Sequence, residues 1–93
     1  MSKFSRPKSW MEHRLADALS IDGVEYRVDL VARRGTGVQG FRVTAVFLPR
    51  GEGREVEAWL PNAASTAEVH GMVRELSSDP GRLEALYREA AAS

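Results

Sequence analysis

The chain has 93 residues, of which 43% are hydrophobic and 28% charged, and its 13 basic residues balance its 13 acidic ones. This is the composition of one small globular domain rather than of a disordered segment. The absence of cysteine excludes disulfides, thiolate catalysis and cysteine-ligated zinc. A net charge of zero differs from the basic excess of dedicated nucleic-acid-binding domains.

The first residues predict the cellular location of the protein, and its arginine content indicates the kind of genome that encodes it. No apolar run could span a bilayer, and the first ten residues lack the apolar segment of a secretory signal, so we expect a cytoplasmic protein without membrane contact. Eleven of the 13 basic residues are arginine, as is typical of a GC-rich bacterial genome. Residues 1–8 are expected to form a flexible basic arm, and residues 9–93 a single domain.

Residues 9–20 predict an N-terminal helix. Ser9 and Glu12 have the spacing of a capping box. An apolar stripe at helical spacing follows them, formed by Met11, Leu15, Ala18 and Leu19. The Asp22-Gly23 pair predicts a turn after this helix.

From residue 24 onward the apolar period changes from helical spacing to alternation. Residues 24–33, 41–48 and 54–60 alternate apolar with polar side chains and are separated by glycine-containing turns, which predicts three strands. Ser65 and Glu68 form another capping box, and Asp79-Pro80 is a typical helix start, so two helices follow. The predicted order is α-β-β-β-α-α. It corresponds to an α+β fold whose three-stranded antiparallel meander has two C-terminal helices on one face and an N-terminal helix near the other.

The strand pattern also predicts a register. In the first hairpin Tyr26 is expected opposite Phe47, because Arg33 would then face Gly40. In the second hairpin Phe47 is expected opposite Val56. This pairing makes one side of the sheet apolar on all three strands, and the C-terminal helices would cover that side.

The opposite side of the sheet mixes charged residues with large apolar ones, which is unusual for a solvated face. We expect the N-terminal helix, a second copy or another protein to cover it, because apolar patches rimmed by charge mark interfaces. The candidate partner-binding residues on this side are Val31, Val46, Leu48 and Trp59, with Arg27, Arg33, Arg42 and Glu57 at the rim.

The glycine-rich segment between the first two strands matches the letters of a dinucleotide-binding motif. That motif needs a helix after the loop, whereas here a strand follows, so we interpret the segment as a hairpin loop. An alternative is an anion-binding loop, since neighbouring backbone amides can bind anions. Its candidate residues are Arg33, Arg34, Gly35, Gly37 and Gly40.

No catalytic or metal-binding set can be assembled from the sequence. Ser9, His13 and Asp17 follow the order of a catalytic triad, but on one helix they would lie side by side. We therefore interpret them as a helix cap and an exposed His13–Asp17 pair. His70 has no second ligand at metal-binding spacing, so neither a metal nor a cofactor is expected.

These patterns predict a non-enzymatic domain that acts by protein–protein contact, as a homodimer or as an accessory or regulatory subunit. The alternative is binding of single-stranded nucleic acid or a phosphate ligand through the hairpin arginines and the basic arm. Neighbouring glutamates disfavour that alternative because they would repel a phosphate backbone.

Overall fold

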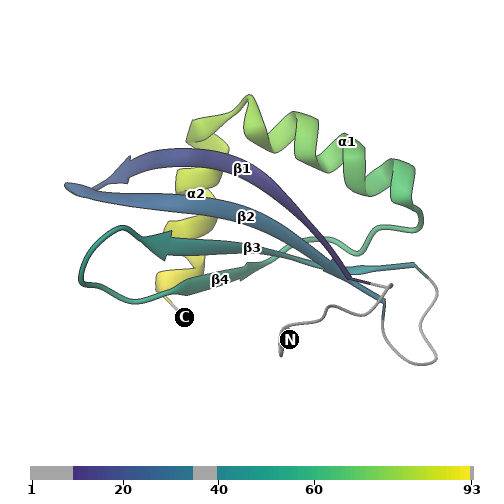
Figure 1. Ribbon diagram of the computed structural model, residues 1–93, viewed down its shortest axis with the longest axis horizontal. Helices are drawn as coiled ribbons and strands as arrows, with labels where there is room; N and C mark the ends of the chain where they lie inside the picture. The colour runs from purple at the N-terminus through teal and green to yellow at the C-terminus, as the bar shows by residue number, and fades with distance from the viewer. Residues whose placement is uncertain (1–9, 35–39, 93) are drawn as a thin grey trace, which may run out of the picture.

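The computed structural model describes residues 10–34 and 40–92, which form one antiparallel sheet in the order β1-β2-β3-β4, followed by two helices. The elements are β1 Trp10–Ile21, β2 Val24–Arg33, β3 Arg42–Pro49, β4 Val56–Trp59, α1 Thr66–Ser77 and α2 Pro80–Ala91. Both helices lie on the same face of the sheet, where α1 packs mainly against β1 and α2 against β4 (Figure 1). The α+β class is confirmed, but the sheet has four strands instead of three. The expected arm at residues 1–8 lies outside the described residues.

The prediction of an N-terminal helix is wrong, because residues 10–21 form β1 and pair with β2. The pairing is regular as far as Arg14 and is then interrupted twice, on either side of Ala16. Each interruption is a β-bulge, which places an extra residue in one strand. Leu15 and Leu19 are both buried, and their four-residue spacing fits one face of a helix and one face of a strand alike, so this spacing alone did not distinguish the two.

The register of the second hairpin is confirmed. Phe47 lies opposite Val56, and the Leu60 amide donates a 3.0 Å hydrogen bond to the carbonyl of Val43. In the first hairpin the prediction is wrong by two residues, since Tyr26 lies opposite Pro49. An even shift keeps every side chain on its predicted face.

Phe41 lies beyond the last pair of the β2–β3 ladder, in which Arg33 is paired with Arg42 rather than with Gly40. Phe41 instead forms a bridge with Ala63, with hydrogen bonds of 2.7 and 3.0 Å. This bridge lies on the β4 side of β3 and extends that pairing beyond β4. The sequence pattern could not show the bridge, because Ala63 follows the last strand.

The core lies between the sheet and the helices. Tyr26, Phe47 and Tyr87 form an aromatic group in which the Tyr87 ring centroid lies 5.0 Å from that of Tyr26 and 5.5 Å from that of Phe47. The two tyrosine hydroxyls share a hydrogen bond of 2.8 Å. The fully buried side chains around this group include Val28, Leu30, Val43, Val69 and Leu83.

The two helix starts are confirmed. The Ser65 hydroxyl accepts a hydrogen bond from the amide of Glu68, and the Glu68 carboxylate accepts one from the amide of Ala64. The Asp79 carboxylate accepts a hydrogen bond from the amide of Arg82 at 3.1 Å, with Pro80 as the first helical residue. Within the part of the chain that the structure describes, neither helix is long and apolar enough to cross a membrane.

Candidate functional site

The face of the sheet that points away from the helices, here called the open face, carries the candidate site. In residues 10–34 and 40–92 no helix or strand lies over it, because both helices pack on the other face and residues 10–21 extend the sheet sideways. Trp59 projects from β4 on this face and is 69% exposed, whereas the large hydrophobic side chains of the core are buried. An exposed indole is the feature that most distinguishes this surface.

Beside Trp59 the open face is hollowed. A cavity of about 320 Å³, here called the Trp59 hollow, is lined by Arg33, Arg34, Arg42, Thr44, Glu57 and Trp59. The strand register brings these residues together, since Arg33 pairs with Arg42 and Thr44 pairs with Trp59. Directly opposed residues share one face of a sheet, so residues from three strands surround the same space.

The Trp59 hollow has an excess of positive charge. Three guanidinium groups line it against the single carboxylate of Glu57. The Arg34 guanidinium also lies 4.9 Å from the centroid of the Phe41 ring. Neither Arg42 nor Glu57 forms an ion pair with another residue of the described ranges. The hollow therefore favours a negatively charged or acidic group.

The remaining predicted partner-binding residues are dispersed over the open face. Val31 is only 6% exposed and offers little surface, while Val46 and Leu48 are half-buried. Arg27 is separated from the Trp59 hollow and forms an ion pair with Asp29 at 3.2 Å. Four of the eight predicted residues line the hollow, namely Arg33, Arg42, Glu57 and Trp59.

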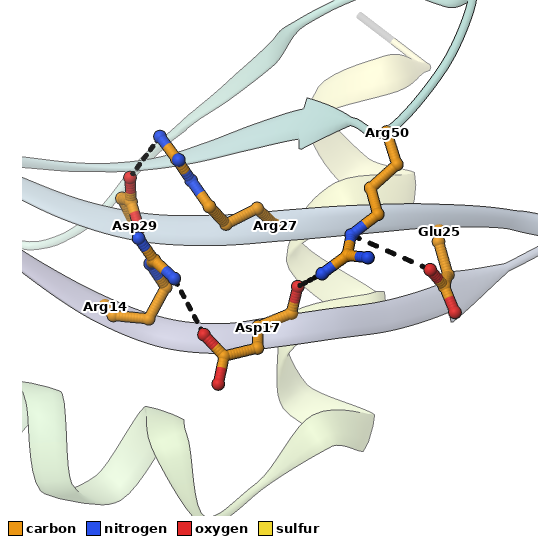
Figure 2. A network of polar contacts seen from close by, with 6 residues as sticks. All are labelled: Arg14, Asp17, Glu25, Arg27, Asp29 and Arg50. Atoms are coloured by element: carbon orange, nitrogen blue, oxygen red, sulfur yellow. Dashed lines mark hydrogen bonds and ion pairs between the residues drawn. The ribbon is translucent and has the colours of Figure 1, made fainter.

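A network of ion pairs occupies the other half of the open face (Figure 2). At its centre the Asp29 carboxylate accepts a 2.7 Å hydrogen bond from Nε of Arg14 and faces Arg27. Arg14 also donates to the carboxylate of Asp17 at 2.7 Å, and these hydrogen bonds to Asp17 and Asp29 raise the pKa of Arg14 above its usual value. Arg50 donates to the carbonyl of Asp17 at the far end of the network. These charged groups pair with one another, which indicates that this half of the open face stabilises the fold.

The network was missed at the sequence level because Arg14 and Asp17 were assigned to a helix. Once residues 10–21 are placed as a strand beside β2, Arg14 lies directly opposite Asp29. Opposite charges on directly opposed residues stabilise a pair of strands. The alternation of charge along β2 is the signal that could have revealed the neighbouring strand.

The anion-binding alternative is described only in part. Gly35 and Gly37 lie outside the described residues. Gly40 has a φ of +83°, and a Cβ at this position would collide with the carbonyl of Ala63. Glycine is therefore required here for a positive φ and a close backbone approach. Arg33 and Arg34 both line the Trp59 hollow.

The two histidines meet between β1 and α1. The ring of His13 contacts that of His70 edge to face, with 5.2 Å between their centroids, and Nε2 of His13 is buried without a hydrogen-bond partner. The predicted exposed pair of His13 with Asp17 is wrong, because β1 turns His13 toward α1 and Asp17 binds Arg14 on the open face. Within the described ranges, no group of three or more potential ligands could hold a metal ion.

A cavity of about 900 Å³ lies on the helix side, between residues 60–62, α1 and the start of α2. Its acidic lining residues include Glu68 and Asp79, whose carboxylates already cap the two helices. Arg74, Glu75 and Arg82 also line this cavity, but unlike the Trp59 hollow it has no aromatic lining residue.

No protein-family model, curated protein or solved structure matches this chain. The chemistry of its own surface is therefore the basis for a functional proposal.

Proposed function

We propose that this chain is a non-enzymatic binding domain that acts by protein–protein contact through the Trp59 hollow and the adjoining Val46 and Leu48. It would work as a homodimer or as an accessory or regulatory subunit. The observation that supports this proposal is the 69% exposure of Trp59 on a sheet face over which no described helix or strand lies. Tryptophan and arginine are the residue types that contribute most to protein–protein affinity.

The arrangement of the hollow fits a protein ligand well. Half-buried apolar side chains beside a charged rim are typical of interface patches, and guanidinium groups bind carboxylates in a fixed, bidentate geometry. The proposal includes no catalytic role, since neither His13 nor His70 hydrogen-bonds a hydroxyl or a carboxylate in the part of the chain that the structure describes.

The test compares three variants of the chain. Trp59→Glu introduces a charge in the hollow, Ala67→Glu introduces the same charge on the exposed surface of α1, and Trp59→Phe retains an aromatic ring. Sedimentation velocity at micromolar concentration and affinity capture from the native cell extract are the measurements. We expect Trp59→Glu alone to lose self-association or a captured protein. A monomeric wild type whose captured proteins are unchanged by Trp59→Glu would refute the proposal.

A second candidate function is the binding of single-stranded nucleic acid or a phosphate ligand. The observation that favours it is the placement of Arg33, Arg34 and Arg42 around the same hollow as an exposed indole, on which a base could stack. Glu57 in this hollow opposes it. Titration of a fluorescent single-stranded oligonucleotide at low and moderate salt tests this function, and binding that does not weaken with salt, or no binding, excludes it.

A further inference from the structure

We propose that the outer edge of β4 pairs with β4 of a second copy of this chain, antiparallel and with Glu57 opposite Trp59 of the second copy. This pairing would join two four-stranded sheets into one sheet of eight strands. The inference rests on the proposed function and specifies its partner, because it identifies the surface around Trp59 as half of a symmetric dimer interface.

The backbone of β4 presents unpaired hydrogen-bonding groups at the sheet edge. The Leu60 amide bonds to the Val43 carbonyl, and hydrogen-bonded and non-hydrogen-bonded pairs alternate along an antiparallel ladder. Residues 56, 58 and 60 therefore direct their amides and carbonyls toward β3. The amides and carbonyls of Glu57 and Trp59 point outward, where the sheet has no further strand. Such an edge is a template for another strand.

Three symmetric registers are available to two copies of this edge, and only one of them satisfies the chemistry. If Glu57 faced its own copy, two like charges would meet on the symmetry axis. If Trp59 faced its own copy, Glu57 would pair with Pro61, which has no amide to donate. With Ala58 on the axis, Glu57 and Trp59 exchange four backbone hydrogen bonds, and the two smallest side chains of the strand meet at its centre.

The charges on the open face complement one another in this register. A two-fold axis perpendicular to the sheet keeps both open faces on the same side. Glu57 of the second copy then lies beside Trp59, and Glu55 of the second copy lies in line with Arg33 and Arg42. The carboxylates thus arrive at the end of the Trp59 hollow that is rich in guanidinium groups, including that of Arg42, which has no ion pair among the described residues.

The helix side of the same edge also leaves room for a second copy. A cavity of about 330 Å³ lies between β4 and α2, lined by Ala58, Leu86 and Ala90 together with Glu57, Trp59 and Glu89. Helix α2 therefore leaves a partly apolar hollow along the β4 edge. In the proposed register the axis passes between the Ala58 residues of the two copies. The two hollows then adjoin, and their apolar linings become buried.

The opposite edge of the sheet is less suited to such pairing. Strand β1 carries two bulges around Ala16, which divide it into regular stretches at residues 10–14 and 19–21. Strand β4 has no bulge from Val56 to Trp59. A strand added along the whole of β1 would lose its register at the bulges, whereas one added along β4 would not.

Single cysteine substitutions test the register, because the chain contains no cysteine of its own. Ala58→Cys places two thiols directly opposite each other at a separation that a disulfide can bridge. Glu57→Cys and Trp59→Cys place them diagonally, about 7–8 Å apart, which a disulfide cannot span. Ala67→Cys on exposed α1 measures background crosslinking. Under mild oxidation we expect Ala58→Cys alone to form a crosslinked dimer, at least ten times faster than the other three.

A second pair of variants tests the backbone contacts. Glu57→Pro removes an amide that points outward, so it spares the β3–β4 ladder, whereas Glu57→Gln retains that amide. Sedimentation equilibrium should show at least a tenfold weaker dimer for Glu57→Pro and a smaller change for Glu57→Gln. Circular dichroism confirms that both variants are folded.

The outcomes separate this proposal from the broader one. Faster crosslinking at position 57 or 59 than at position 58 would overturn the register, and so would equal dimer affinities of Glu57→Pro and wild type. A wild type that stays monomeric at about 100 μM would overturn self-pairing altogether. Loss of a different captured protein in Trp59→Glu would, in that event, leave the proposed protein–protein function intact.

Discussion

The two faces of one sheet use their aromatic residues in opposite ways. On the covered face, Tyr26 and Phe47 contact Tyr87 of α2, and both strand residues are buried. On the open face, Trp59 is 69% exposed. The same four strands support both faces, so the difference arises from what packs against each one. The covered face contributes to the folding core, while the open face leaves apolar surface exposed.

The largest expected effect lies on the covered face, at Phe47, which is fully buried. Phe47→Ala should lower the free energy of unfolding by about 3–5 kcal/mol, because it removes buried surface and leaves a cavity. Phe47→Leu fills most of that space and should cost under about 2 kcal/mol. Urea denaturation followed by circular dichroism measures both. Equal losses for the two variants would show that the site does not depend on packing volume.

The next effect is an alkaline loss of stability that also belongs to the covered face. The hydrogen bond between the Tyr26 and Tyr87 hydroxyls, together with burial, raises the pKa of Tyr26 from 10.0 to about 12. Because the folded state disfavours ionised Tyr26, its contribution is fully present below pH 10.0 and is lost as the pH rises toward about 12. We expect a decline on the order of 2 kcal/mol across this range.

The control for the alkaline transition is Tyr26→Phe, which cannot ionise and should show a shallower decline. The chain has only two tyrosines and two lysines and no cysteine, so few other groups titrate in this range. Absorbance of tyrosinate follows the ionisation directly, and urea denaturation at each pH gives the stability. A decline of the same size in Tyr26→Phe would contradict the assignment to Tyr26.

A smaller effect is expected in the ion-pair network of the open face. The side chain of Asp29 is only 12% exposed and serves Arg14 and Arg27 together. Asp29→Asn should lower the free energy of unfolding by about 1–2 kcal/mol, since charged hydrogen bonds are lost while both arginines remain half-exposed. Asp17→Asn is the matched control, because its side chain is 82% exposed and should cost under about 0.5 kcal/mol. Similar losses in both would mean that burial of Asp29 adds nothing.

The smallest expected effect on stability occurs at the most exposed aromatic residue. Trp59→Ala should change the free energy of unfolding of the monomer by less than about 0.5 kcal/mol, since an exposed side chain removes little buried surface. Urea denaturation at a concentration below the dimer range tests this. A loss comparable to that of Phe47→Ala would show that Trp59 belongs to the folding core and would remove the contrast between the two faces.

The sequence could predict those features that depend on local pattern. Alternation identified the covered face, and the capping residues Ser65 and Asp79 located both helix starts. The β3–β4 register followed from matching apolar positions such as Ala45 and Ala58. Each of these signals lies within a few residues of the element it specifies, which is why it could be read without the structure.

The features that the sequence could not predict depend on distant or irregular pairing. The two bulges in β1 interrupt the alternation typical of a strand, and the first hairpin is shifted by two residues from the register that apolar matching favours. The same limits apply to the site. Arg33, Arg42 and Trp59 were candidates from their shared face, but the contribution of Thr44 to the hollow emerges only when the strands are aligned.

The bulges of β1 have a consequence for the size of the proposed assembly. If β4 pairs with its own copy, each molecule uses its edge without bulges, and the outer strands of the resulting sheet are the two bulged β1 strands. A third molecule would then meet only edges whose register is interrupted. The bulged strand would thus favour a closed pair over open-ended fibres.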